Sequence, residues 1–190
     1  MLSIKNNNKY EYLIKNSKFI SLLYKVDTKE EIKKILEEVK TKYPNATHYC
    51  YAYILDSETK ADDDKEPSKT AGLPILNQLK SNNLDHILLI VVRYFGGIKL
   101  GTGLLTRTYS KVAKEVINKD NIIKLTKGYN ITITFKYKDI KKIDYLLKDS
   151  QILKKDFQDN ITYNVNVNEI TLSKLQNYNI KINKEIYIEK

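Results

Sequence analysis

The sequence predicts an α+β protein with two domains. Strand-like runs of β-branched and aromatic residues alternate with stretches whose apolar residues recur at helical spacing. The chain has 190 residues, a length that suits one large domain or two small ones, and the pattern begins again after residue 127. We therefore expect one domain over residues 1–126 and a second over residues 127–190. Because no Gly- or Pro-rich linker separates them, we expect a short hinge near residue 127.

The first domain opens with two short strands, predicted over residues 10–15 and 19–26, and a helix follows them. Thr28 and Glu31 form a capping box, in which side chains satisfy the free N–H groups of the first helical turn. Four apolar residues then recur at helical spacing and give the helix one buried stripe: Ile32, Ile35, Leu36 and Val39. The segment 43–45 ends this helix.

Alternation next predicts a strand over residues 47–55, with His48 and Cys50 on one face and three tyrosines on the other. Periodicity then disappears over residues 56–70, so we expect a loop, which holds the one concentrated acidic stretch of the chain. Helical spacing returns after this loop, and Pro74 falls in the first turn, where a proline is tolerated.

A central strand and a long helix complete the first domain. Residues 87–92 are apolar on both faces, as expected of a strand that is covered on both sides. A glycine-rich turn follows, and a helix then continues to about Lys119. Its inward residues are Leu105, Tyr109, Val112 and Val116, and its basic stripe consists of Arg107, Lys111 and Lys114.

The second domain repeats such patterns on a smaller scale. The predicted elements are a strand over residues 131–137, a helix from Asp139, a hairpin of residues 152–157 and 161–167, a short helix from Asn168 and a strand over residues 180–188. This β-α-β-β-α-β order is that of a ferredoxin-like sandwich.

Composition excludes several classes of protein. Hydrophobic residues make up 42% and charged residues 29%, which is typical of a globular protein. The single Cys50 excludes an internal disulfide and a four-thiolate zinc site. The longest aliphatic run, residues 87–92, is far shorter than the ~20 residues that span a bilayer. Because the first nine residues lack an apolar segment, we expect no secretory signal, no membrane partner and a cytoplasmic location.

The net charge of +10 has two interpretations. Lys and Arg number 33 against 23 Asp and Glu, and such a surplus favours polyanionic partners because bound phosphates release their counterions. Lysines also keep a surface solvated, and they dominate the surplus. Residues 1–126 carry +6 and residues 127–190 carry +4, so neither half alone explains the charge.

Four of the six glycines lie in one segment that precedes the last helix of the first domain. Its candidate site residues are Arg93, Tyr94, Gly96, Gly97, Gly101 and Gly103. Glycines let backbone N–H groups approach a ligand, and a helix start suits a phosphate or a carboxylate. Arg93 and Lys99 would add charge-assisted hydrogen bonds. The alternative is a tight strand-to-helix turn, since the glycine spacing is not that of a phosphate loop.

The acidic loop offers a second group of candidate residues. Asp63, Asp64 and Glu66 carry the oxygen ligands that a hard divalent cation prefers, and Thr70 stands at the helix start. The spacing does not fit an EF-hand, and an exposed, solvated loop is the alternative, so we assign no metal and leave the cofactor unknown. His48 is a candidate acid or base, and with Cys50 it forms either a nucleophilic pair or two core residues.

Together these clusters resemble the YigZ/IMPACT family, also known as uncharacterised family 29, over residues 14–120. The matching residues of the strand are His48, Cys50 and Ala52. Those of the loop are Asp63, Asp64, Glu66, Pro67, Thr70, Ala71 and Gly72. Those of the glycine-rich segment are Arg93, Tyr94, Phe95, Gly96, Gly97, Leu100, Gly101 and Gly103.

The resemblance implies that the first domain has the fold of the second domain of small-subunit ribosomal protein five. It also implies that the second domain is like the ferredoxin-like last domain of elongation factor G. The chain departs from the family pattern at three glycines, which are replaced by Lys65, Lys69 and Leu104. If those glycines take positive φ, each replacement costs ~1 kcal/mol of strain.

Two functions follow as expectations. The first is a non-enzymatic RNA- or ribosome-associated factor linked to regulation of translation, with Lys99, Arg107, Lys111 and Lys114 as nucleic-acid-binding residues. The alternative is a protein or enzyme that binds a small phosphorylated or anionic ligand between the acidic loop and the glycine-rich segment. A plain protein-interaction module is a third interpretation. The sequence defines neither a reaction nor an oligomeric state.

Overall fold

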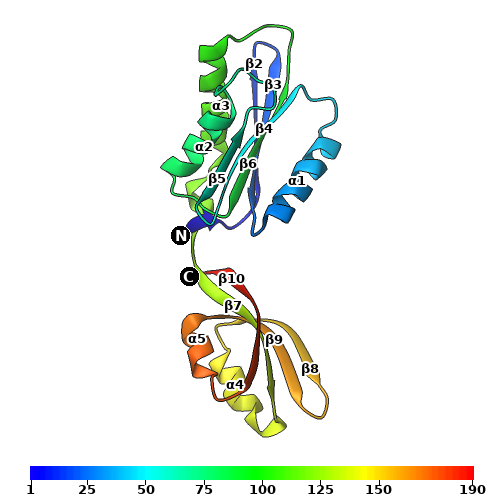
Figure 1. Ribbon diagram of the computed structural model, residues 1–190, viewed down its shortest axis with the longest axis vertical. Coiled ribbons are helices and arrows are strands. Elements are labelled where there is room, and N and C mark those ends of the chain that lie inside the picture. Colours follow the sequence, from blue (N-terminus) through cyan, green and yellow to red (C-terminus); the bar gives the residue numbers. More distant parts are fainter. The chain divides into compact units, whose positions relative to one another are not determined.

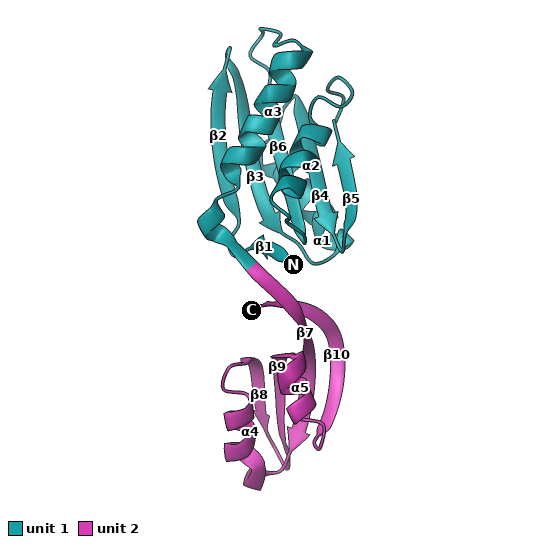
Figure 2. Ribbon diagram, turned by 90° about the vertical axis from the view of Figure 1, so that its left-hand side faces the viewer, with its two compact units in different colours: residues 1–123 teal, residues 124–190 magenta.

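The computed structural model describes residues 1–190 as an α+β protein with two sheets and five α-helices, which confirms the predicted class (Figure 1). The chain divides into unit 1, Met1–Ile123, and unit 2, Lys124–Lys190 (Figure 2). This division lies inside one long strand, β7 (Ile122–Phe135). Gly128, expected near a hinge, is instead a paired residue of that strand, opposite Asn168 and Ile186.

Unit 1 contains an antiparallel sheet with the strand order β2-β3-β6-β4-β5. In chain order, its strands are β2 (Asn8–Ile14), β3 (Ser17–Lys25), β4 (His48–Leu55), β5 (Glu58–Asp62) and β6 (Ile87–Tyr94). A short strand, β1 (Leu2–Ile4), precedes them, and Leu2 forms a bridge with Leu84. The central strand β6 is buried from Ile87 to Arg93, as its continuous apolar run predicts.

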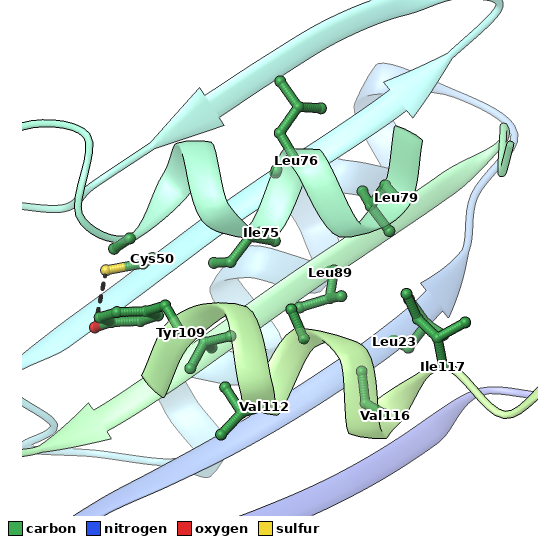
Figure 3. Packing of buried hydrophobic residues seen from close by; sticks show 14 of the residues in the cluster. Leu23, Cys50, Ile75, Leu76, Leu79, Leu89, Tyr109, Val112, Val116 and Ile117 are labelled. Carbon is green, nitrogen blue, oxygen red and sulfur yellow. Dashed lines mark hydrogen bonds between the residues drawn. The ribbon is translucent and has the colours of Figure 1, made fainter. Parts of the chain in front are cut away.

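Helices cover both faces of this sheet (Figure 2). One core lies between the sheet and α1 (Lys29–Lys42), and it includes Ile32, Val39 and Val92. The other core lies between the sheet and the pair α2 (Gly72–Ser81) and α3 (Thr102–Val116). Figure 3 shows side chains of this second core, in which α2 and α3 pack side by side. The two faces of β4 divide as predicted, with Cys50 in the second core and Tyr53 in the first.

Local signals account for most element boundaries. Thr28 accepts a hydrogen bond from the Glu31 N–H at 3.1 Å and so caps α1. The Glu31 carboxylate accepts from the Asp27 N–H at 2.8 Å, one residue before the position that the capping box predicts. The helix α3 ends at Val116, earlier than expected, because Asn118 caps a short 3₁₀ turn, Lys119–Asn121.

The predicted loop over residues 56–70 is wrong in its first part, which forms β5. This strand pairs with β4 at the edge of the sheet, and its side chains are largely exposed. An exposed edge strand needs no apolar alternation, so the sequence carried no strand signal here. The hairpin turns at Asp56 and Ser57, which both have positive φ although neither is a glycine.

Unit 2 follows the predicted β-α-β-β-α-β order. Its elements after β7 are a 3₁₀ turn (Tyr137–Asp139), α4 (Ile140–Leu146), β8 (Gln151–Phe157), β9 (Ile161–Asn168), α5 (Glu169–Lys174) and β10 (Asn179–Glu189). The antiparallel strand order is β10-β7-β9-β8. Apolar residues of one sheet face pack with those of α4 and α5, among them Ile131, Val165, Ile143 and Leu175. No helix of the chain has the length and apolar character that crossing a membrane requires.

Candidate functional site

The three sequence clusters meet at one cavity in unit 1. The cavity has a volume of about 420 Å³ and lies where β4 begins, β6 ends and α3 begins. Five predicted site residues line it: His48, Glu66, Arg93, Lys99 and Gly101. Its remaining lining residues are Thr47, Pro67, Phe95, Leu100, Thr102 and Leu105. Ionisable groups therefore occupy part of the wall, and apolar side chains occupy the rest.

Glu66 is the centre of a buried network. Its side chain is only 3% exposed, and its Oε1 accepts hydrogen bonds from Arg93 Nη1 and from the Tyr109 hydroxyl, the latter at 2.8 Å. Its Oε2 lies 3.7 Å from His48 Nε2. A buried carboxylate is costly unless such partners satisfy it. The acidic loop is therefore not the freely solvated segment that one sequence interpretation expected.

Arg93 is held on three sides but keeps an unused donor. It is 5% exposed, and its guanidinium lies 5.4 Å from the ring centre of Phe19 and 5.6 Å from that of Phe95. The ion pair with Glu66 satisfies Nη1. The buried Nε has no hydrogen-bond partner, although buried donors are normally satisfied. This side chain therefore has donor capacity at the wall of the cavity.

His48 has a defined orientation. Its Nδ1 lies 2.7 Å from the backbone carbonyl of Asp64. Because a carbonyl oxygen only accepts, Nδ1 must carry the hydrogen. The other nitrogen, Nε2, is then directed toward Glu66, and His48 is part of the cavity wall. The ring is thus positioned by the acidic loop.

Asp63 and Asp64 support the loop and do not line the cavity. The Asp63 carboxylate accepts from the N–H groups of Lys69 at 2.7 Å, Ala71 at 3.0 Å and Gly72 at 2.8 Å. Asp64 accepts from the Tyr49 N–H at 2.6 Å. No group of three His, Cys, Asp or Glu side chains is placed to hold a metal ion. Backbone donors and Arg93 engage the oxygens of Asp63, Asp64 and Glu66 in this structure, and a cation site in the loop stays a hypothesis from the sequence.

Cys50 and His48 are not a nucleophilic pair. Cys50 is fully buried, and its Sγ lies 3.0 Å from the Asp63 carbonyl and 3.3 Å from the Tyr109 hydroxyl, the contact drawn in Figure 3. Burial raises the pKa of the Cys50 thiol far above its usual range, and nearby carboxylates add to this effect. Because the thiolate is the nucleophile, this cysteine is a core residue.

The glycine positions have different physical roles. Gly97 and Gly101 have φ values of 85° and 75°, which favour glycine. A Cβ on Gly96 would lie 2.0 Å from the carbonyl carbon of Asn16, so this position admits no side chain. Gly103 lies in the first turn of α3 with ordinary space around it. Among these glycines, only Gly101 lines the cavity.

The start of α3 is left without a side-chain cap. Gly101 occupies the N-cap position, where it offers no hydrogen-bond acceptor. The Leu105 N–H donates to the Gly101 carbonyl at 3.0 Å, so the N–H groups before it have no partner within the helix. Gly101 and Thr102 also line the cavity. The positive end of the helix dipole is therefore close to Lys99 and Arg93.

The replaced glycines fall into two classes. Lys65 and Lys69 have φ values of 67° and 63°, so both side-chain-bearing residues adopt the left-handed conformation that glycine favours. Leu104 lies inside α3 and packs partly against the core, and it carries no positive φ. The condition for strain is therefore met at the two lysines and not at Leu104.

Several predicted residues lie outside the cavity. The Thr70 hydroxyl donates to the Pro67 carbonyl at 2.6 Å, and the Tyr94 hydroxyl donates to the Pro44 carbonyl at 3.2 Å. Arg107, Lys111 and Lys114 are exposed on α3, as predicted. Lys111 Nζ lies 4.0 Å from the ring centre of Tyr12 on β2.

Sequence reasoning missed the part that Tyr109 plays in the Glu66 network. Tyr109 was expected only as an inward residue of α3, and it is fully buried. A tyrosine at a core position carries a hydroxyl that needs a partner, and this need was the available signal. Phe95 stood inside the quoted segment, but its contact with Arg93 had no sequence signature.

Comparison with known proteins places the site in a family. The family model of the Impact N-terminal domain matches residues 15–117, a range that includes every residue lining the cavity. The chain belongs to the IMPACT family. IMPACT family member YvyE of Bacillus subtilis is 36% identical over 172 residues, which cover 88% of this chain and 79% of that protein. IMPACT family member YigZ of Escherichia coli is 34% identical over 152 residues, which cover 76% and 74%.

A solved structure of a hypothetical protein extends this IMPACT family likeness to the fold. It is 27% identical to this chain, covers 95% of both chains and has a TM-score of 0.65. The rabbit Protein IMPACT is 32% identical over 93 residues, which cover 46% of this chain and 29% of that protein. The predicted family resemblance is thus confirmed.

Proposed function

We propose that the cavity of unit 1 binds the phosphate or carboxylate group of a small ligand. The observation that carries this proposal is Arg93, a residue of the cavity wall whose buried Nε has no hydrogen-bond partner. Leaving a buried donor unsatisfied costs about 1–3 kcal/mol, so a rotation of the Arg93 side chain that brings its Nε to an anion in the cavity would be favourable.

The surroundings of Arg93 support the same ligand chemistry. The uncapped start of α3 offers backbone N–H groups, and Lys99 adds an exposed positive charge. Glu66 neutralises the charge of Arg93 in their ion pair, so the positive field at this wall comes from Lys99 and the start of α3. This function is the alternative expected from the sequence, and the charged groups at the cavity wall support it.

The apolar part of the wall defines the rest of the ligand. Phe95, Leu100 and Leu105 line the same cavity as the charged groups. Pockets of this kind orient a ligand by a few polar groups and bury its apolar body. We therefore propose a small organic anion, and we assign no reaction to it.

Calorimetric titration with inorganic phosphate and with phenyl phosphate tests this function. Phenyl phosphate should bind more tightly, because its ring can contact the apolar wall. Lys99→Gln should weaken binding of either anion by about tenfold, the size of one charge-assisted hydrogen bond. Lys114→Gln removes the same charge from the exposed side of α3 and should leave binding unchanged. Equal losses in the two variants, or no binding of either anion to the wild type, would contradict the proposal.

A second candidate function is the RNA- or ribosome-associated factor linked to regulation of translation. The observation that favours it is the exposed row of Arg107, Lys111 and Lys114, in a protein of net charge +10. Lys111 packs over the ring of Tyr12, which joins the row to β2. Here Lys99 belongs to the cavity and not to the row. Loss of RNA affinity on replacing these three residues by Ala would support this function.

We also propose the finer fold assignments that the resemblance implies. For unit 2, the strand order β10-β7-β9-β8, with helices on one face, supports the ferredoxin-like fold. For unit 1, the proposal is the fold of the second domain of small-subunit ribosomal protein five. The antiparallel order β2-β3-β6-β4-β5 is the order to compare with it.

A further inference from the structure

The sheet of unit 2 has one face that no helix covers. The buried apolar residues of the sheet pack with those of α4 and α5. Both helices lie on the same side of the sheet (Figure 2). On the open face, the residues of β7 and β9 that alternate with this core are asparagines and threonines. They are Asn130, Thr132, Thr134, Thr162, Asn164 and Asn166.

Amide side chains connect all four strands across this face. Asn183 of β10 donates to Asn130 of β7 at 2.9 Å, and Asn130 donates to Asn164 and Asn166 of β9, both at 2.8 Å. Asn166 donates to Gln151 of β8 at 3.0 Å. We call these five residues the amide row. Asn130 is 7% exposed and uses both amide hydrogens within the row, whereas the four outer amides are half-buried or exposed. Because neighbours hold them, these outer amides offer fixed and uncharged hydrogen-bonding groups.

Lysines flank the amide row on both outer strands. In the strand register, Lys154 of β8 lies opposite Asn164, and Lys181 and Lys184 of β10 lie opposite Thr132 and Asn130. All three lysines are exposed and form no ion pair, whereas Lys127 and Lys155 are paired with Glu185 and Asp144. One acidic residue, Asp156, lies on the same face, opposite Thr162. The face therefore carries a positive surplus.

The open face lacks aromatic side chains at its strand positions, and this absence restricts the partner. Proteins that read single-stranded RNA stack its bases on aromatic rings, which these Asn, Thr, Gln and Lys positions do not supply. Double-helical RNA is instead recognised through its phosphates and 2′-hydroxyls across a shallow minor groove. An amide is both donor and acceptor, as a 2′-hydroxyl is, and lysines neutralise phosphates.

The lysines and amides on the open face are arranged in the same sequence as the groups across that minor groove, with phosphates on the outside and 2′-hydroxyls between them. The lysines of β8 and β10 are separated by three inter-strand steps, roughly 14 Å, with the amide row between them. We propose that this open face binds the sugar–phosphate backbone of double-helical RNA, with the lysines on phosphates and the amide row on 2′-hydroxyls. The inference rests on the second candidate function and assigns to it a surface in unit 2 that is separate from α3.

Titration of the full chain with a short RNA duplex, at several salt concentrations, tests this surface. Replacing Lys154, Lys181 and Lys184 by Gln should lower the affinity at least tenfold and reduce the log–log salt slope by about 2–3. Replacing Lys138, Lys141 and Lys174 by Gln makes the same charge change at exposed positions outside the open face, and should alter affinity less than twofold. Equal losses in the two variants would overturn the proposal.

Two further measurements test the contribution of the amide row and the RNA-binding function on which this proposal rests. The DNA duplex of the same sequence should bind more weakly, and Asn164→Ala should reduce this preference without changing the salt slope, because no charge is lost. Equal binding of RNA and DNA by the wild type would overturn the role of the amide row. If only the α3 variant of Arg107, Lys111 and Lys114 lost RNA binding, this surface would be wrong and the RNA function would stand. If the wild type bound no RNA duplex, both would be wrong.

Discussion

The two units each contain a polar network, and the two networks differ in charge and in burial. In unit 1, Glu66 and Arg93 form an ion pair whose side chains are 3% and 6% exposed. In unit 2, the amide row is uncharged, and only its central Asn130 is buried, while its outer members are half-buried or exposed on an open sheet face. Removing one member of a buried ion pair leaves the other charge buried without a partner, whereas removing one amide leaves only a neutral group without its hydrogen bond. The charged network is therefore the more constrained of the two.

The largest loss of stability expected from this contrast follows the removal of the Glu66 side chain. Glu66→Ala leaves Arg93 as a buried cation without its carboxylate and removes the acceptor of the Tyr109 hydroxyl. We expect the free energy of unfolding to fall by about 3–5 kcal/mol, as measured by urea denaturation.

The matched removal in unit 2 is Asn130→Ala, at the centre of the amide row. It deletes neutral hydrogen bonds only, so we expect a loss of about 1–2 kcal/mol. Hydrogen exchange at β6 and at β9 assigns each loss to its own unit. A loss at Asn130 as large as that at Glu66 would contradict the distinction between charged and neutral networks.

A smaller effect is expected at alkaline pH, and only in unit 1. Since burial raises the pKa of Cys50 in the folded state, the unfolded chain loses the thiol proton first, near pH ~8.5. The stabilisation is fully present below that pH and is lost as the pH rises above it, by about 1.4 kcal/mol per pH unit. The pKa of Tyr109 is also raised by burial and adds to the loss at higher pH.

Denaturation curves between pH 7 and pH 10 measure this dependence. Cys50→Ser removes the thiol and should flatten the curve between pH 8.5 and pH 10, relative to the wild type. Native Cys50 should also resist alkylation at pH 8, because the thiol is buried. Rapid alkylation of the native protein would be incompatible with the position of this side chain.

The smallest expected change in stability concerns the acidic loop of unit 1, at the two lysines with positive φ. Lys65→Gly and Lys69→Gly should each raise the free energy of unfolding by about 0.5–1 kcal/mol, because glycine relieves the positive φ. Lys60→Gly lies in β5, where glycine weakens a strand, and should lower it. Thermal denaturation of the three variants measures the sign, and destabilisation by both loop substitutions would contradict the strain.

The sequence predicted most elements because their signals were local. The cap at Thr28 and the apolar run of β6 depend on neighbouring residues alone. The exposed edge strand β5 was missed because it buries little, and Gly128 was taken for a break although it is paired within β7. Strand pairing at the sheet edge is a long-range contact that periodicity does not reveal.

The residues of the site could be predicted from the sequence, but the hydrogen bonds and ion pairs among them could not. His48, Glu66 and Arg93 were identified as candidates, and the structure brings them to one cavity. The sequence did not tell which of the neighbouring carboxylates turns inward, so Asp63 and Glu66 received the same role. That choice depends on the backbone of the loop, where Asp63 accepts three N–H groups and Glu66 faces Arg93.

The three hydrogen bonds to Asp63 bear on how distant relatives of this chain should be recognised. They hold the loop in its path although Lys65 and Lys69 occupy left-handed positions. A search pattern that requires glycine at positions 65 and 69 would therefore reject this chain. A pattern built on Asp63, Glu66 and Arg93 would accept it, since these side chains, and not the turns between them, carry the contacts that shape the cavity.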